Sequence, residues 1–141
     1  MIVYFDTSSF VKLYVDEEGS AASREVMASA ELAASSWLLF LEMRGALSRM
    51  YRGSRIDASF HESALARFGD DWSRAVRIPV TESILRTAAE LAERHLLRAL
   101  DAIHLASALT LSRREEVLLS AWDRSLLDAA VAEGMRVATR E

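Results

Sequence analysis

Short apolar segments alternate with helix-length segments along the whole chain, and this alternation is the strongest constraint on its fold. Five of the short segments are apolar and bounded by turn or capping residues, as buried strands are. They cover residues 2–5, 32–35, 77–80, 117–120 and 135–138. Strands that alternate with helices favour right-handed crossovers. We therefore predict a three-layer α/β/α fold around a central five-stranded parallel sheet.

Capping residues mark the ends of the helices between these strands. Ser, Thr and Asp side chains accept hydrogen bonds from the free N–H groups of a first helical turn. Thr7-Ser8-Ser9 is predicted to cap a helix over residues 10–14, and Ser35 or Ser36 one over 37–51 that Gly53 ends. Asp57 is predicted to cap a helix running to about Val76. The remaining predicted helices cover residues 20–29, 82–95, 98–111 and 123–133.

The chain has 141 residues, of which 51% are hydrophobic, and no linker or repeat interrupts it, so we expect a single domain over residues 1–141. No apolar run approaches the ~18 residues of a membrane helix. The N-terminus lacks the basic region of a signal peptide, which favours a cytoplasmic protein without membrane association. Cysteine is absent, which excludes disulfides and cysteine-bound zinc. The net charge of −4 argues against a broad basic surface for nucleic acid.

Four carboxylates stand at the edges of apolar segments. Asp6 and Asp123 follow predicted strands, Glu42 lies inside an apolar helical stretch, and Asp101 begins another. A carboxylate in such surroundings is unfavourable unless something pairs it. Each also has an ordinary alternative: Asp6 and Asp123 can cap helices, Asp101 can interact with a helix dipole, and Glu42 can face solvent. Taken singly, none of the four indicates a function.

The sheet gives these acids a reason to meet. Ligands of parallel α/β sheets bind outside the carboxyl ends of the strands, where the strand order reverses. If the first and fourth strands are neighbours there, Asp6 and Asp123 reach the same crevice. Carboxylates within a few ångströms raise one another's pKa values, and a divalent cation relieves that repulsion. Oxygen ligands without Cys or His favour Mg²⁺ or Mn²⁺ over zinc.

Four segments resemble the motifs of PIN domains, in the order of that family. Residues 4–13 are similar to the opening of PIN domains, especially of VapC-type toxins from bacterial toxin–antitoxin pairs. Residues 41–47 resemble the second acidic motif, residues 97–106 the third and most specific one, and residues 119–126 the fourth. One departure is Ser120, where the family often has threonine, and this change keeps the hydroxyl.

The resemblance implies a divalent-metal-dependent endoribonuclease with catalytic and metal-binding residues Asp6, Glu42, Asp101 and Asp123. Asp6 and Asp101 are the predicted principal ligands of Mg²⁺ or Mn²⁺, and the other two acids complete the site directly or through water. The partners implied are an RNA substrate, a cognate antitoxin protein that inserts an arginine among the acids, and a second copy of the chain in a homodimer.

Further residues are given supporting roles. Thr7 or Ser8 is predicted to orient Asp6 by hydrogen bonding, or simply to cap the helix, and Ser120 to support the same site. His104 follows Asp101 by three residues on an apolar face and is predicted to be a packed core histidine rather than a ligand or general base.

Basic and apolar residues near the acids suggest how partners bind. The predicted phosphate contacts are Lys12, Arg44, Arg49 and Arg52, with Arg55 following, although a solvated helix face is the more usual explanation of such arginines. Some of the large apolar residues nearby are predicted to form a groove for a partner helix, with the alternative that all of them belong to the core. They are Phe10, Leu13, Tyr14 and residues 37–41.

Other classes of protein fit the sequence less well. An Asp-nucleophile phosphohydrolase would have a second aspartate two residues after the first, where Ser8 stands. A phospho-accepting receiver domain needs a functional lysine late in the chain, and Lys12 is the only lysine. A PIN-type scaffold that binds RNA or protein without catalysis is the main alternative, and the presence of all four acids argues against it.

Overall fold

The computed structural model describes residues 1–138 and has a parallel sheet at its centre. Its strands are β1 (Ile2–Phe5), β2 (Leu32–Ser36), β3 (Val76–Ile78), β4 (Val117–Ser120) and β5 (Arg136–Val137). They are ordered β3-β2-β1-β4-β5, and every neighbouring pair is parallel. The predicted five-stranded parallel sheet is confirmed. Its strand order reverses between β1 and β4, as the prediction for Asp6 and Asp123 requires.

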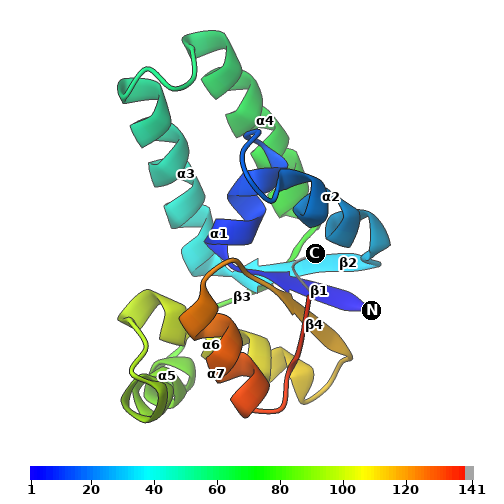
Figure 1. Cartoon of the computed structure of the whole chain (residues 1–141), viewed down its shortest axis with the longest axis vertical. Helices are drawn as coiled ribbons and strands as arrows, with labels where there is room; N and C mark the ends of the chain where they lie inside the picture. The colour runs from blue at the N-terminus through cyan, green and yellow to red at the C-terminus, as the bar shows by residue number, and fades with distance from the viewer. Residues whose placement is uncertain (139–141) are drawn as a thin grey trace.

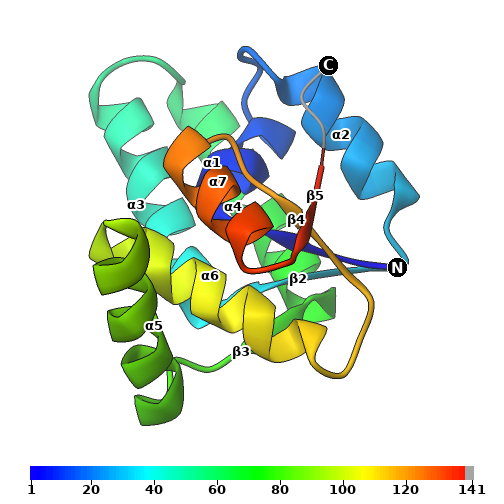
Figure 2. The same cartoon turned by 60° about the horizontal axis from the view of Figure 1, so that its bottom comes forward.

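Helices cover both faces of the sheet (Figure 1). One layer contains α1 (Thr7–Phe10), the 3₁₀ turn η1 (Val11–Leu13), α2 (Ser20–Ser29), α3 (Trp37–Arg52) and α4 (Ala58–Arg74). The other contains α5 (Glu82–His95), α6 (Ala99–Ser112) and α7 (Arg124–Ala132), and Figure 2 brings this layer forward. The α3–α4 hairpin extends away from the sheet. In residues 1–138, no helix is long and apolar enough to cross a membrane.

The alternating side chains of β1 divide the interior into two cores. Val3 and Phe5 pack with α1, α3 and α4, where Phe68 is fully buried. Tyr4 points to the opposite face and packs with α6 and α7, where Leu105 and Leu126 are fully buried. A strand buried on both faces is why residues 2–5 form an uninterrupted apolar run.

The first helix begins earlier than predicted, and the prediction that Thr7-Ser8-Ser9 caps it is wrong. Asp6 is the capping residue, with an extended backbone and a carboxylate that accepts from the Ser9 N–H. The three hydroxyl residues lie inside α1 because the strand delivers Asp6 in the conformation that a cap needs. The chain then tightens into the 3₁₀ turn over Val11–Leu13.

The third and fifth strands also differ from their predicted bounds. Helix α4 ends at Arg74, and β3 covers Val76–Ile78 instead of residues 77–80. The strand stops because Pro79 has no N–H to give to the ladder. Strand β5 is only two residues long, Arg136–Val137, within the predicted range of 135–138.

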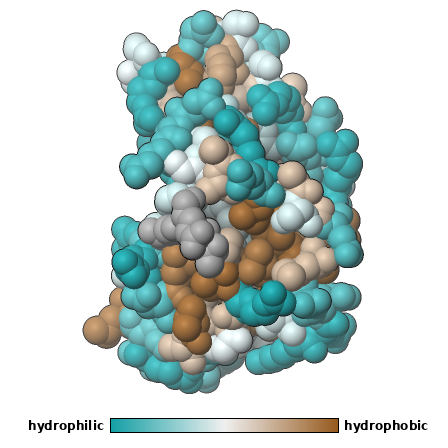
Figure 3. Space-filling model, turned by 45° about the vertical axis from the view of Figure 1, so that its right-hand side comes forward, coloured by the Kyte–Doolittle hydropathy of each residue, from teal (hydrophilic) through white to brown (hydrophobic). Residues whose placement is uncertain are grey.

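Hydrophobic residues also reach the surface. Figure 3 shows a large hydrophobic area below the middle of one face, bordered by hydrophilic residues, and smaller hydrophobic areas near the upper end of that face. The most exposed large apolar side chain is that of Leu96, at 89%. Leu96 ends α5 in a left-handed conformation, with φ 56°.

Two glycines with left-handed backbone allow the effect of backbone strain on stability to be distinguished from that of close packing. A Cβ at Gly19 (φ +89°) would overlap the Trp122 ring, whereas one at Gly134 (φ +86°) would have no atom within 4 Å. We expect Gly134→Ala to lower the free energy of unfolding by about 1 kcal/mol, from backbone strain alone. Gly19→Ala should lower it by about 3 kcal/mol because overpacking is added. Urea unfolding of both variants measures this difference, and equal losses would contradict the packing of Trp122 on Gly19.

Candidate metal centre

Asp6 lies at the carboxyl end of β1 and is only 3% exposed. The Ser9 N–H donates to Oδ1 at 3.0 Å, and the Ser8 hydroxyl lies 2.7 and 2.8 Å from the two carboxylate oxygens. The Ser8 oxygen also accepts from the backbone N–H of Trp122 at 3.0 Å. Ser8 therefore makes the hydrogen bond predicted for it and ties Asp6 to the connection between β4 and α7.

Glu42 lies on α3 and is held by two side chains from other elements. Thr7 Oγ1 donates to Glu42 Oε1 at 2.7 Å, and His104 Nε2 lies 2.8 Å from the same oxygen. Since a carboxylate only accepts, His104 Nε2 carries a proton. Of the two hydroxyls predicted as alternatives for orienting Asp6, Ser8 makes the contact, and α1 turns that of Thr7 toward α3 instead.

His104 is 2% exposed, which confirms its prediction as a packed histidine, but it also links two polar groups across the interior. Its Nδ1 lies 2.8 Å from the hydroxyl of Tyr4 on β1. The contact with Glu42 joins residues 62 positions apart, so no local pattern in the sequence could have indicated it. Burial raises the pKa of Glu42, but the hydrogen bonds from His104 and Thr7 outweigh that effect and leave the pKa below its ordinary value.

Asp101 and Asp123 meet at a single arginine. Asp101 lies in the first turn of α6, and Asp123 caps α7 by accepting from the Leu126 N–H at 2.9 Å. Arg98 Nη2 lies 3.5 Å from Asp101 Oδ2 and 3.4 Å from Asp123 Oδ2. The Arg98 side chain is 82% exposed, so solvent weakens both ion pairs. Sequence patterns gave no sign of this arginine, although it immediately precedes α6.

The acids influence one another's ionisation. Burial, opposed by the nearby His104 and by hydrogen bonds and reinforced by the Asp101 charge, raises the pKa of Asp6 to about 6. Burial and then the Asp123 carboxylate raise the pKa of Asp101, and Glu42 adds to the effect. Strand pairing explains the proximity, because Phe5 is in register with Ser120 and both strands end at the same edge. Asp101 thus interacts with each of the other three acids.

The donor set is that of a hard divalent cation. All four acids offer oxygen, and cysteine is absent from the chain. In residues 1–138, no three Asp, Glu or His side chains are already arranged to hold a metal ion. Arg98 supplies positive charge between Asp101 and Asp123, where a cation between these carboxylates would also supply it. The residues therefore fit Mg²⁺ or Mn²⁺ in donor type and charge.

Comparison with known proteins identifies the fold that carries these acids. The family model of the PIN domain matches residues 3–121, which include Asp6, Glu42 and Asp101. The chain belongs to the PIN-domain family. It is also 36% identical over 137 residues to ribonuclease VapC45 of Mycobacterium tuberculosis, covering 97% of this chain and 94% of that protein. The PIN domain described here is thus a homologue of VapC-type ribonuclease toxins.

Solved structures agree with this assignment. FitAcB from Neisseria gonorrhoeae superposes with a TM-score of 0.70 at 16% identity, covering 99% of this chain and 97% of that chain. VapC20 of Mycobacterium tuberculosis, described as a toxin that cleaves the sarcin-ricin loop, gives 0.66 at 18% identity, with 90% and 94% covered. At these identities the likeness concerns the fold, and it confirms the predicted PIN-like architecture.

Ser120 and Lys12, predicted to support the acids and to bind phosphate, contact other residues of the PIN domain. The Ser120 hydroxyl hydrogen-bonds with that of Ser9 rather than with an acid. Lys12 Nζ lies 3.1 Å from Glu17 Oε1 and 5.1 Å from the centre of the Trp122 ring. Lys12 is therefore engaged within the protein, and its predicted phosphate contact would require it to leave Glu17.

The predicted arginines of the PIN domain lie on α3 and are exposed. The guanidinium of Arg44 lies 5.7 Å from the centre of the Phe40 ring. Arg49 and Arg52 lie in the last turns of the helix, and Arg49 lowers the pKa of Glu42. The structure thus separates Arg49 from the others as the arginine whose charge reaches the acids.

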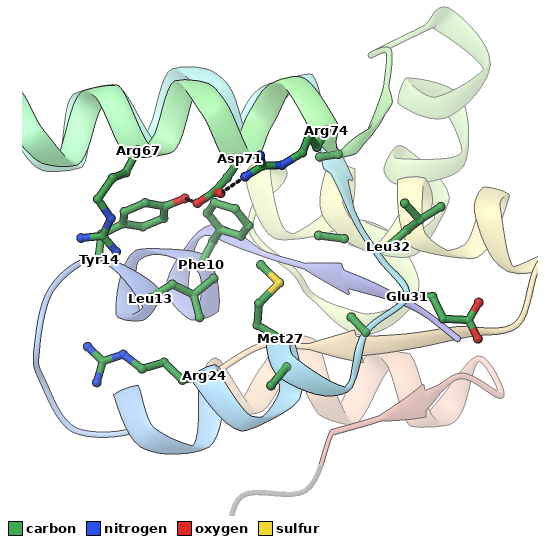
Figure 4. A pocket seen from close by; sticks show the side chains of 14 residues that line it. Phe10, Leu13, Tyr14, Arg24, Met27, Glu31, Leu32, Arg67, Asp71 and Arg74 are labelled. Atoms are coloured by element: carbon green, nitrogen blue, oxygen red, sulfur yellow. Dashed lines mark hydrogen bonds and ion pairs between the residues drawn. The ribbon is translucent and has the colours of Figure 1, made fainter.

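A groove of about 600 Å³ opens between α2 and α4 of the PIN domain (Figure 4). Phe10, Leu13 and Tyr14 line it, as predicted, together with Met27 of α2. The Tyr14 hydroxyl donates to Asp71 of α4. Residues 37–41 do not line the groove: Leu39 is fully buried in the core, and Trp37 packs edge-on against Trp72, with ring centres 5.3 Å apart.

The buried charge of Asp6 should reduce the stability of the metal-free protein. Burial raises the pKa of Asp6 from 3.8 to about 6, so the folded protein holds this proton more tightly than the unfolded chain does. Stability therefore falls as the pH rises through this interval. Asn carries no charge and still caps a helix. We expect Asp6→Asn to raise the free energy of unfolding by about 2 kcal/mol near neutral pH in EDTA, with the gain disappearing near pH 4.

Urea unfolding at both pH values measures this gain. Asp57→Asn is the matched control, since Asp57 caps α4 by accepting from the Phe60 N–H but lies at an exposed position. This control should change stability little at either pH. A loss of stability in Asp6→Asn near neutral pH would contradict the cost assigned to the buried carboxylate.

Proposed function

We propose that this PIN-domain protein is a divalent-metal-dependent endoribonuclease that acts as the toxin of a toxin–antitoxin pair inside the cell. The observation that carries the proposal is that Asp6 and Asp123 follow the paired strands β1 and β4 at one edge of the sheet, where Arg98 lies 3.4 Å from Asp123 and 3.5 Å from Asp101. The 36% identity with ribonuclease VapC45 over nearly the whole chain supports it.

Asp6 and Asp101 would hold Mg²⁺ or Mn²⁺, and Glu42 and Asp123 would complete the site directly or through water. Such an ion lowers the pKa of a bound water and neutralises charge on the phosphodiester. The chain's own residues prepare the ligands: Ser8 orients the carboxylate of Asp6, while Thr7 and His104 hold Glu42 in its ionised form. These contacts come from α1 and α6, the elements that enclose the sheet edge.

A non-catalytic scaffold is the alternative, and the burial of Asp6 disfavours it. Burial raises the pKa of this carboxylate to about 6, so its ionised form, which still predominates at neutral pH, is held at a cost that an exposed carboxylate does not have. A surface that only binds RNA or protein gains nothing from a buried acid next to Asp101. A nuclease that needs a cation at this place does gain from it.

Cleavage of RNA tests the proposal directly. Wild-type protein incubated with total RNA and Mg²⁺ or Mn²⁺ should cut it, and EDTA should stop the reaction. Asp6→Asn and Asp101→Asn should each lower the rate by about 10²-fold or more, because the site loses a metal ligand. Asp57→Asn, which removes the same charge at an exposed helix cap, should cleave normally.

Mn²⁺ titration calorimetry separates a nuclease from a scaffold, because only the former should bind Mn²⁺ in a way that depends on the acids. Near-wild-type cleavage by both Asp6→Asn and Asp101→Asn would sink the assignment of these residues. Mapping the ends of the cleaved fragments identifies the RNA.

The groove between α2 and α4 is the proposed site of the antitoxin (Figure 4). FitAcB and VapBC2 of Rickettsia felis share the fold, and a structure from Klebsiella pneumoniae that also matches is a toxin–antitoxin complex. The groove combines an apolar floor, including Phe10 and Met27, with arginines of α2 and α4 at its rim. These features suit an amphipathic helix with acidic residues along its edges. The predicted antitoxin arginine among the acids and the homodimer both stay predictions from the family resemblance.

Met27→Asp tests this groove. A charge on its apolar floor should abolish co-purification of the toxin with the antitoxin encoded beside it, while RNA cleavage continues, because the acids are untouched. Val131→Asp is the control: Val131 is an apolar residue on α7, 57% exposed, and does not line the groove. Unchanged co-purification of Met27→Asp would place the antitoxin elsewhere.

A further inference from the structure

A small hollow on α3 lies beyond Glu42 along the helix. Its volume is about 190 Å³, and it is lined by Ala46, Arg49, Met50 and Arg55. Arg49 follows Glu42 by seven residues, so it lies on the same face of α3 about 10 Å farther along. The hollow therefore flanks the acids on the side of the α3–α4 hairpin.

A glycine gives the Arg49 side chain its place. A Cβ at Gly45 would lie 3.1 Å from Arg49 Nη1, so the guanidinium lies back along the helix over the bare Gly45 backbone. This direction points from Arg49 back toward Glu42, which lies on the same face of α3. The side chain thus has a defined position next to the metal centre.

The two guanidinium groups at the hollow, those of Arg49 and Arg55, make no close ion pair within the protein's described residues. Among residues 1–138, no carboxylate lies within ion-pair distance of Arg49. Arg55 has only a distant partner, since its Nη2 lies 3.9 Å from Glu17 Oε2, while the other oxygen of Glu17 accepts from Lys12 at 3.1 Å. Two guanidinium groups at one hollow can therefore receive an external anion.

We propose that Arg49 and Arg55 form a subsite for a backbone phosphate of single-stranded RNA, next to the phosphate that is cleaved. This inference rests on the proposed nuclease function and adds where the substrate strand runs. Guanidinium groups bind phosphate through paired N–H donors. A chain with net charge −4 and four acids at its centre repels RNA, so local cations are needed to hold the strand beside them.

Binding can be measured without cleavage. Fluorescence anisotropy of a labelled single-stranded oligoribonucleotide in EDTA reports the Kd of the wild-type protein across a range of salt concentrations. Arg49→Gln should raise the Kd about tenfold at low salt, because a charge-assisted contact is lost. The slope of log affinity against log salt should become shallower by about 0.7, the value for one phosphate contact to a single strand.

Arg86→Gln is the control for net charge. It removes the same charge from an exposed position on α5, where Arg86 pairs with Glu82. This variant should bind RNA with nearly the wild-type Kd and salt slope. If Arg49→Gln and Arg86→Gln behave alike, the subsite is overturned.

A second test displaces the Arg49 guanidinium without removing it, and has its own control. Gly45→Ala places a methyl group against Arg49 and should raise the Kd a few-fold. Gly69→Ala places the same methyl group in α4 with no atom within 4 Å, and should leave the Kd unchanged. Both changes favour the helix, since alanine is the better helix former, so unfolding does not explain a loss of affinity.

The two proposals fail in different ways. A wild-type protein that cleaves RNA with added metal, but whose Kd does not respond to Arg49→Gln, overturns the subsite and leaves the nuclease standing. A wild-type protein that binds RNA through Arg49 but cleaves none with Mg²⁺ or Mn²⁺ overturns the nuclease and keeps the subsite.

Discussion

The parallel pairing of β1 with β4 brings the acidic residues together. Phe5 and Ser120 are in register at the point where the strand order reverses, so the chain leaves both strands at the same edge of the sheet. Asp6 and Asp123 are the residues that cap the helices following these strands. Because the capping geometry aims each carboxylate at its own helix, the backbone itself holds two negative charges at one place. The α3 and α6 helices then add Glu42 and Asp101 from the two sides of the sheet.

Hydrogen bonds keep this cluster from relaxing apart. The Ser8 oxygen accepts from Trp122 and its hydroxyl donates to Asp6, which couples the ends of β1 and β4. His104 connects Tyr4, in the core below the sheet, to Glu42 above it. Burial keeps the pKa of Asp6 raised, although the nearby His104 and the hydrogen bonds from Ser8 and Ser9 oppose that effect. The site is thus maintained against its own repulsion by packing and hydrogen bonds elsewhere in the fold.

Local patterns predicted the sheet and the four acids because each depends on residues close together in the sequence. The run over residues 2–5 could only be a buried strand, and Asp6 ends it. The details that local patterns left open depend on tertiary contacts. Thr7 binds Glu42 because α1 packs against α3, 35 residues away, and Trp37 packs on Trp72 instead of lining the groove. Local patterns did not indicate Arg98, because an exposed arginine before a helix is common in sequences. Its role depends on Asp123, which only the folded chain brings next to it.

Most of the ion pairs on the surface are close, but those of Asp101 and Asp123 at the sheet edge are not. Glu17 engages Lys12, and Asp71 engages Tyr14 and Arg74, so much of the surface charge is balanced within the fold. Within residues 1–138, the ion-pair partner of both Asp101 and Asp123 is Arg98, which is exposed and lies 3.5 and 3.4 Å from their carboxylate oxygens. An incomplete balance at this position leaves the sheet edge with attraction for a cation, and a bound cation in turn attracts phosphate. In the proposed nuclease, a bound cation would offset part of the repulsion between these acids and RNA, so the affinity for RNA would rise with the concentration of the metal ion.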